Sequence, residues 1–301
     1  KLMKNKMDIS NLDTEKRNKN SENLDTLNSL EIVSLMNKED ENIPKAIAKV
    51  LPTIAKLVDA VIETFNKGGR LIYIGAGTSG RLGILDASEC VPTFGVSKEM
   101  VVGLIAGGRK AIVDAVEGAE DNREMGIKDL KDIDFSKKDI LVGLSASGRT
   151  PYVVSALEYA KGIGAVTGSI SCNSNSEMAS IADYGIDISP GPEILSGSTR
   201  LKSGTAQKMV LNMISTASMI GIGKAYKNLM VDVQPTNEKL IERSKRIIME
   251  ATDSNYEHAE EFFEKSGRNV KVAIVMILTN SSKDDAIKRL KETNGFISKT
   301  L

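Results

Sequence analysis

Helical spacing of apolar residues marks the first long segment of the chain. Between residues 43 and 66 apolar side chains recur every three or four positions, which predicts one amphipathic helix ended by Lys67-Gly68-Gly69. A shorter helix is expected over residues 26–37. Residues 1–25 are rich in Lys, Asn, Asp and Ser, and this composition favours an extended arm that is disordered unless a partner orders it.

Short apolar runs that end in glycine or serine follow this helix. Such runs are typical of buried parallel strands. They occur at residues 70–75, 100–106, 139–145, 165–171 and, more weakly, 184–189. Helical patterns lie between most of them, over residues 79–90, 110–131, 151–162 and 176–181. This alternation predicts an α/β fold with a doubly wound, mainly parallel five-stranded sheet flanked by helices.

The last third of the chain has a helical texture. Residues 201–226 form an apolar pattern on several helix faces, so this helix is expected to be buried on several sides and to lie at the interface of a homodimer. Four shorter helices are expected over residues 236–251, 255–265, 270–278 and 283–292. The expected organisation is an arm with a short helix (1–40), an α/β domain (41–231) and a C-terminal helical subdomain (232–301).

The amino-acid composition excludes some classes of binding partner. Lys plus Arg and Asp plus Glu each number 40, and only 4% of residues are aromatic, with no Trp. The chain therefore offers neither the basic surface nor the stacking platform that nucleic acid requires. No run approaches the roughly 20 apolar residues of a membrane span, and residues 1–22 lack the apolar core of a signal peptide. A cytoplasmic location without a membrane partner is expected.

Few residues suited to metal or imidazole chemistry are present. The chain has two cysteines, Cys90 and Cys172, and one histidine, His258. This set supplies neither a zinc site nor a disulfide framework, so no metal is expected. Any proton transfer would fall to carboxylates, Lys or Tyr.

A glycine-rich turn follows the first predicted strand, in the string Gly75-Ala-Gly-Thr-Ser-Gly-Arg81. Glycines let the backbone approach a ligand, and the unpaired N–H groups of the next helix form an anion site. A plain capped turn would give a similar string, so this motif alone is only moderately specific. The string also lacks the Gly-Lys-Ser/Thr ending of nucleotide-binding loops, and the second strand does not end in the acidic residue of a dinucleotide fold.

A second turn of this kind, Ser145-Ala-Ser-Gly-Arg-Thr-Pro151, follows the third predicted strand. Two hydroxyl-rich turns in one sheet are harder to explain as helix caps alone, and together they predict a nest for one phosphoryl group of a small molecule. The expected ligands of that group are Gly77, Thr78, Ser79, Ser145, Ser147 and Thr150. Arg81 and Arg149 either add charge to this nest or lie on the surface.

The two turns together resemble those of the sugar isomerase domain family. The run of residues 75–90, with the strings at 104–108, 115–124, 147–153 and 197–213, resembles the N-acetylmuramic acid 6-phosphate etherases within that family. The resemblance covers about residues 25–250. Val91 departs from it, since the family has Pro there, but this position supplies no functional group.

This resemblance implies a lyase reaction. Members release D-lactate from N-acetylmuramic acid 6-phosphate and leave N-acetylglucosamine 6-phosphate, by elimination followed by addition of water. The family's catalytic carboxylates map onto Glu89, the acid that protonates the leaving lactate, and Glu120, the base at C2. An acid that stays protonated near neutral pH must be buried, and the apolar Ile84, Leu85 and Phe94 are expected to bury Glu89.

Alternatives remain open at this point. Without the resemblance, Glu89 and Glu120 are not distinguishable from Glu117 and Asp121, and Asp86 is expected to be structural. The same domain also serves in non-catalytic sugar-phosphate sensors and in aldose–ketose phosphate isomerases. A sensor needs the phosphate turns but no acid and base, so the presence of both glutamate motifs favours an enzyme.

Overall fold

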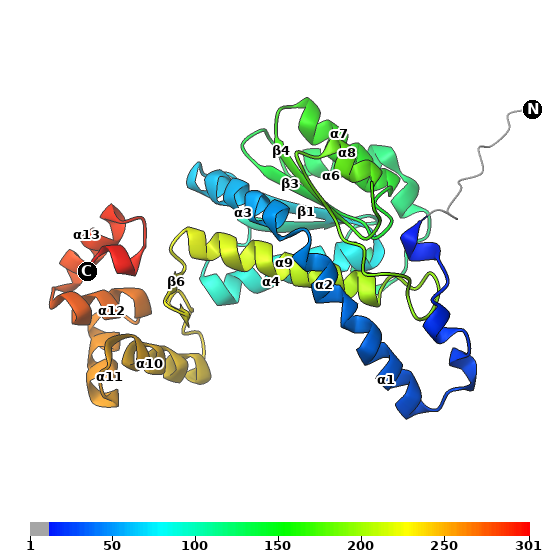
Figure 1. Ribbon diagram of the computed structural model, residues 1–301. Helices are drawn as coiled ribbons and strands as arrows, with labels where there is room; N and C mark the ends of the chain where they lie inside the picture. The colour runs from blue at the N-terminus through cyan, green and yellow to red at the C-terminus, as the bar shows by residue number, and fades with distance from the viewer. Residues whose placement is uncertain (1–11) are drawn as a thin grey trace, which may run out of the picture. The chain divides into compact units, whose positions relative to one another are not determined.

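The computed structural model describes residues 12–301 (Figure 1). Residues 1–11, which belong to the expected N-terminal arm, lie outside the described residues. Contacts divide the chain into two compact units. The first comprises residues up to Ala87 together with Val101–Ile214, and the second comprises Ser88–Met100 and Ser215–Leu301. The domain boundaries at residues 40 and 231 stay a prediction.

A five-stranded parallel sheet forms the centre of the first unit, which confirms the predicted fold. Its strands are β1 (Leu71–Gly75), β2 (Val101–Ile105), β3 (Ile140–Leu144), β4 (Val166–Ser171) and β5 (Tyr184–Asp187). They lie in the order β2-β1-β3-β4-β5. β1 therefore pairs with β2 on one side and with β3 on the other. The strands are short and largely buried because helices cover both faces.

Nine helices begin in the first unit of the described chain. They are α1 (Ser29–Asp40), α2 (Asn42–Ala48), α3 (Leu51–Asn66), α4 (Gly77–Phe94), α5 (Lys110–Val113), α6 (Arg123–Asp132), α7 (Pro151–Gly162), α8 (Glu177–Ile181) and α9 (Lys202–Gly221). Glycines in the strands allow close packing on both faces. A Cβ at Gly168 would meet Leu57 of α3, and one at Gly143 would meet Val153 and Leu157 of α7.

Four predicted segments differ from the structure, and the last of them, over 201–226, is described with the second unit. The helix expected over 43–66 is two helices, α2 and α3, and Pro52 stands at the start of α3. The helix expected over 110–131 is also broken. Gly118 adopts a positive φ of 74°, a 3-10 turn spans Ala119–Asp121, and Asn122 caps α6 by accepting a hydrogen bond from the Met125 amide. The third segment is the N-terminal arm expected over residues 1–25.

Residues 13–26 form three 3-10 turns rather than an extended arm. The turns span Asp13–Glu15, Lys19–Ser21 and Leu24–Thr26. The Thr14 amide donates to Asn173 Oδ1 at 3.2 Å, and Ser21 Oγ donates to the Ile194 carbonyl at 2.7 Å. The expectation of disorder is therefore wrong for these residues, because hydrogen bonds to distant parts of the first unit hold them.

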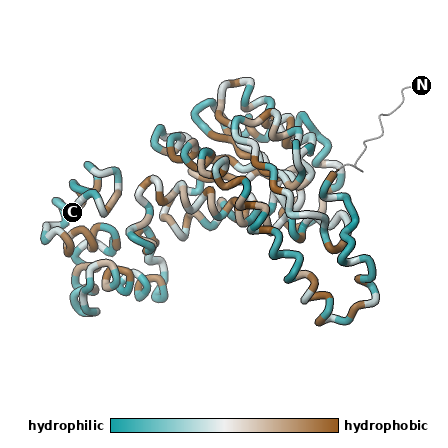
Figure 2. Tube along the Cα trace, viewed as in Figure 1, coloured by the Kyte–Doolittle hydropathy of each residue, from teal (hydrophilic) through white to brown (hydrophobic). Residues whose placement is uncertain are grey.

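The second unit is a helical bundle with its own core. Its helices are α10 (Glu238–Thr252), α11 (Tyr256–Lys265), α12 (Val270–Thr279) and α13 (Lys283–Glu292). α12 is hydrophobic along much of its length (Figure 2) and seven of its ten residues are buried. The predicted helix over 201–226 ends earlier, since α9 stops at Gly221. A short hairpin of β6 (Ala225–Tyr226) and β7 (Leu229–Met230) follows it.

No helix among residues 12–301 is both long and apolar enough to cross a membrane.

A buried carboxylate joins the sheet to two helices of the first unit. Asp86 of α4 is 3% exposed. It accepts hydrogen bonds from Tyr73 Oη of β1 at 2.9 Å and from Lys208 Nζ of α9 at 2.8 Å. A buried charge is stable only when such partners satisfy it, which supports the structural role expected for Asp86.

We expect Asp86→Asn to lower the free energy of unfolding by about 2–3 kcal/mol, because Lys208 loses its counter-charge while the site stays buried. Chemical denaturation followed by circular dichroism measures this loss. Asp59→Asn is the matched control, since Asp59 is exposed on α3. Equal stability of the two variants would contradict the structural role of Asp86.

Candidate active site

The two hydroxyl-rich turns leave neighbouring strands at the same edge of the sheet. β1 and β3 are parallel partners, and Gly75 stands opposite Leu144 in their register. The chain leaves β1 toward β2 on one side, whereas β3 lies on the other side. In open α/β sheets such a change of direction opens a crevice at the carboxyl ends of the strands, where ligands bind.

The first turn brings the start of α4 close to β1. Gly77 has a positive φ of 53°, a conformation that favours glycine. Gly80 packs so tightly that a Cβ there would lie 2.6 Å from Ile105 Cγ1 and 2.8 Å from the Gly75 carbonyl oxygen. The amides of the first helical turn have no acceptor within the helix, so this end of α4 attracts anions.

A cavity of about 260 Å³ lies beside this helix end. Gly77, Thr78 and Arg81 of α4 line one side of it, and the segment from Asp114 to Glu120 lines another. Arg81 helps to hold that segment, since its guanidinium donates to the Ile112 and Asp114 carbonyls at 3.0 and 3.4 Å. The structure thus brings Gly77 and Thr78 to the same cavity as Glu120, whose side chain is exposed to solvent.

The second turn gathers three hydroxyl groups. Ser145 Oγ lies 2.8 Å from Thr150 Oγ1 and 3.2 Å from Ser147 Oγ, and the Gly148 amide donates to Ser145 Oγ at 3.0 Å. Gly148 has a positive φ of 71°, and a Cβ there would lie 2.4 Å from Ser176 Cβ. Only glycine fits this position, so the turn geometry that clusters the hydroxyls depends on it. No side chain caps α7, whose N-cap residue is Thr150.

Ser79 has a partner that the sequence analysis did not assign. The Ser79 hydroxyl is buried and donates to Gln207 Oε1 of α9 at 2.8 Å. Gln207 is 1% exposed, and its Nε2 has no hydrogen-bond partner among residues 12–301. Gln207 lies in the string 197–213 that carried part of the family resemblance, and this was the only signal for it in the sequence.

The N-terminus of α9 differs from that of α4. Glu193 is 1% exposed, and its two carboxylate oxygens accept hydrogen bonds from the Lys202 and Ser203 amides, both at 2.9 Å. A carboxylate of the chain itself therefore satisfies the first turn of α9. The start of α7, by contrast, has no side-chain cap.

Glu89 does not have the environment expected from the sequence. It lies in the part of α4 that belongs to the second unit, whereas Glu120 belongs to the first. Its side chain is exposed, and Leu85 is 44% exposed as well. The expected burial of Glu89 is therefore wrong for the single chain. That Glu89 and Glu120 act together stays a prediction.

Sulfur and metal chemistry have few candidates in the described part of the chain. Cys90 and Cys172 are both buried and free of disulfides. Burial raises the pKa of the Cys172 thiol to about 12. Among residues 12–301 no three His, Cys, Asp or Glu side chains are grouped so that they could hold a metal ion.

Comparisons with known proteins agree with the fold. The model of the SIS (sugar isomerase) domain matches residues 126–217, and that of the glucokinase regulatory protein N-terminal SIS domain matches residues 53–161. A phosphoheptose isomerase structure from Francisella tularensis shares 17% identity, with a TM-score of 0.48 over 64% of this chain and 100% of that one.

Relatives of much higher identity extend over nearly the whole chain. The N-acetylmuramic acid 6-phosphate etherase of Listeria monocytogenes serotype 4b is 62% identical over 97% of this chain and 99% of that protein. N-acetylmuramic acid 6-phosphate etherase 2 of Enterococcus faecalis is 59% identical over 98% of this chain and 100% of that protein. With this identity along its length, the chain belongs to the N-acetylmuramic acid 6-phosphate etherase family.

Proposed function

We propose that this protein is a carbon–oxygen lyase that cleaves the D-lactyl ether of N-acetylmuramic acid 6-phosphate. The products are N-acetylglucosamine 6-phosphate and D-lactate, as in the catabolism and recycling of cell-wall amino sugars. The observation that carries this proposal is the cavity that the start of α4 and Glu120 both line. This one cavity thereby offers both an anion-binding helix end for the phosphate and a carboxylate for the base.

The phosphoryl group is bound by the two turns. Its ligands are the amides and hydroxyls of Gly77, Thr78, Ser79, Ser145, Ser147 and Thr150. The hydroxyl of Ser79 can donate to phosphate only if it no longer donates to Gln207. Rotation of the Gln207 amide by a half turn achieves this, because Nε2 then donates to Ser79 Oγ and gains the partner it lacks.

The chemistry starts from the open-chain sugar, in which the C1 aldehyde acidifies the C2 proton. Glu120 takes this proton, and the electron pair forms a C2–C3 double bond as the C3–O bond breaks. Glu89 gives its proton to the departing lactyl oxygen. Water then adds across the double bond, with hydroxyl at C3 and hydrogen at C2. No cofactor is required, because the carbonyl of the substrate accepts the developing charge.

A carboxylic acid that keeps its proton at neutral pH needs an apolar surrounding, and the single chain leaves Glu89 exposed. Protonation of Glu89 then requires that the bound substrate or a second subunit covers it. This requirement agrees with the proposal of a homodimer. The proposed location is the cytoplasm, where the phosphorylated sugar is available, and neither nucleic acid nor membrane is a partner.

Two other functions fit the same fold, a sugar-phosphate sensor and an aldose–ketose isomerase. Incubation with N-acetylmuramic acid 6-phosphate, followed by an assay for free D-lactate, separates the three. Only the lyase releases lactate, so a purified, folded protein that binds this substrate without releasing lactate would rule out the proposed reaction.

Glu89→Gln and Glu120→Gln should each lower turnover at least about 100-fold, because each variant loses a proton-transfer group. Substrate binding should persist, which calorimetry on the inactive variants checks. Glu117→Gln controls for Glu120, since Glu117 lines the same cavity, and Glu99→Gln controls for Glu89 in the second unit. Near-normal turnover of either catalytic variant would remove its assigned role.

Ser79→Ala and Ser147→Ala should mainly raise KM, by roughly tenfold each, because each removes a hydrogen bond to the charged phosphoryl group. Gln207→Leu should raise KM in the same way, and adding it to Ser79→Ala should cost little more, since the two groups act as a pair. Ser180→Ala, an exposed hydroxyl on α8, is the control. An unchanged KM in both serine variants contradicts the phosphate site.

Sedimentation velocity should show a dimer at micromolar concentration. Ile220 of α9 is 49% exposed in the single chain, and Ile220→Lys should shift the species toward monomer by burying a charge at the interface. Ile287→Lys, at a similarly exposed position on α13, should leave the dimer intact. A wild-type monomer at this concentration would count against the proposed interface.

A further inference from the structure

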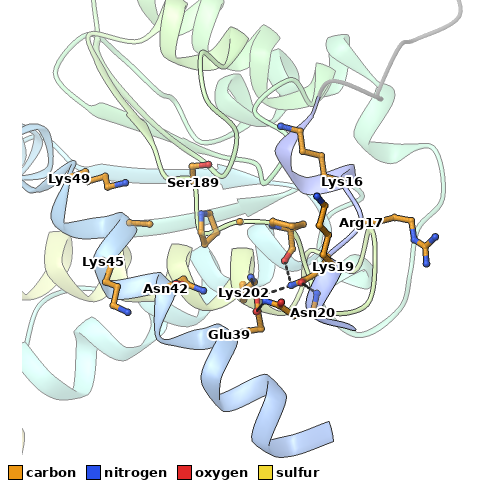
Figure 3. Close-up of a pocket in the computed structure, with 15 residues that line it drawn as sticks. Lys16, Arg17, Lys19, Asn20, Glu39, Asn42, Lys45, Lys49, Ser189 and Lys202 are labelled. Carbon is orange, nitrogen blue, oxygen red and sulfur yellow. Dashed lines mark hydrogen bonds and ion pairs between the residues drawn. The ribbon is translucent and has the colours of Figure 1, made fainter. Parts of the chain in front are cut away.

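A second cavity of the first unit has an unusual charge. It measures about 720 Å³ and is lined by several parts of the first unit (Figure 3). These are the N-terminal turns, the end of α1 and the α2 region, the segment that follows β5, and Lys202 at the start of α9. Six lining side chains are cationic: Lys16, Arg17, Lys19, Lys45, Lys49 and Lys202. Glu39 is the one carboxylate among the described residues that line it.

The single carboxylate is already neutralised. Glu39 Oε2 lies 2.8 Å from Lys202 Nζ, and both side chains are buried. Burial raises the pKa of Glu39, but hydrogen bonds from Lys202, Asn20 and Asn18 outweigh it and hold the pKa below its usual value. Glu39 and Lys202 thus form a buried ion pair at the cavity, and the pair has no net charge.

The remaining cations are mostly unpaired. Lys16 has a partner in Asp13 at 2.7 Å. Arg17, Lys19, Lys45 and Lys49 form no ion pair with any residue from 12 to 301. The whole chain has equal numbers of cationic and anionic residues, so this concentration is a local excess. Like charges around one hollow repel each other and raise the local concentration of anions, which relieve that repulsion.

The cavity is separate from the proposed substrate site. It lies beyond the carboxyl end of β5, where Ser189, Pro190 and Gly191 contribute to its wall. β4 stands between β5 and the strand that carries the second hydroxyl-rich turn. The two cavities have no lining residue in common.

We propose that this basic cavity binds a second small molecule that carries phosphoryl groups. Its volume is within the range of small-molecule sites, and four unpaired cations suit a ligand with two or more negative charges. The side-chain amide of Asn42 supplies a neutral hydrogen-bond donor that orients it. A ligand there bridges the N-terminal turns, α2 and the segment after β5, and so stabilises their arrangement.

Pyrophosphate is the probe that tests this site, by titration calorimetry on the full chain. Lys19→Gln combined with Lys45→Gln should weaken its binding at least about tenfold, because two charge-assisted contacts are lost. Lys38→Gln combined with Lys56→Gln is the control with the same change of net charge. Both of its side chains are exposed and lie outside the cavity. Ser147→Ala tests whether pyrophosphate binds at the hydroxyl-rich turns instead.

Three outcomes would overturn the proposal. They are no binding to the wild-type chain, equal loss in the cavity and control variants, and loss in Ser147→Ala alone. Protection from acylation provides a measurement on the unaltered chain, should the cavity variants fold poorly. Pyrophosphate should slow the modification of Lys19 and Lys45 several-fold relative to Lys56, as measured by mass spectrometry. Equal rates at all three lysines with and without pyrophosphate would also contradict the site.

Discussion

The in-register pairing of β1 with β3 is the constraint on which the candidate active site depends. Gly75 and Leu144 are the last paired residues of their strands, so both turns leave the sheet at the same level. A parallel ladder fixes this level for every residue that follows. Moving either strand by one residue would separate the turns and reverse the faces of its side chains. The proposed phosphate site, which uses both turns, rests on this common level.

α9 contributes to this site although it lies more than 50 residues further along the chain. Lys208 donates a hydrogen bond to the buried Asp86 of α4, and the neighbouring Gln207 accepts one from Ser79, which lies nearer the start of α4. The start of α9 is in turn fixed by Glu193 and by the ion pair of Lys202 with Glu39. A buried network of this kind costs much when one member is lost, so it keeps the helix in one position. Precise placement of Ser79 thus depends on residues with no catalytic role.

The sequence predicted the strands well and the breaks between helices poorly. Short apolar runs bounded by glycine leave few alternatives, so all five strands were placed within about two residues. Breaks such as the one at Gly118 depend on a single residue with positive φ, which periodicity over a longer window conceals. Gln207 and the basic cavity were missed for a different reason. Their partners are far apart in sequence, so only the folded chain brings them together.

The exposure of both glutamates limits what the single chain can do. Glu120, the proposed base, is exposed where it lines the cavity beside the start of α4. Glu89, the proposed acid, is exposed as well, whereas a carboxylic acid that works at neutral pH is in general shielded from solvent. The two proposed roles thus require different surroundings, whereas both glutamates are exposed in the single chain. In the proposed reaction the cover for Glu89 comes from substrate or from another subunit, so the proposed acid step, rather than proton removal from C2, is the one that depends on assembly or closure.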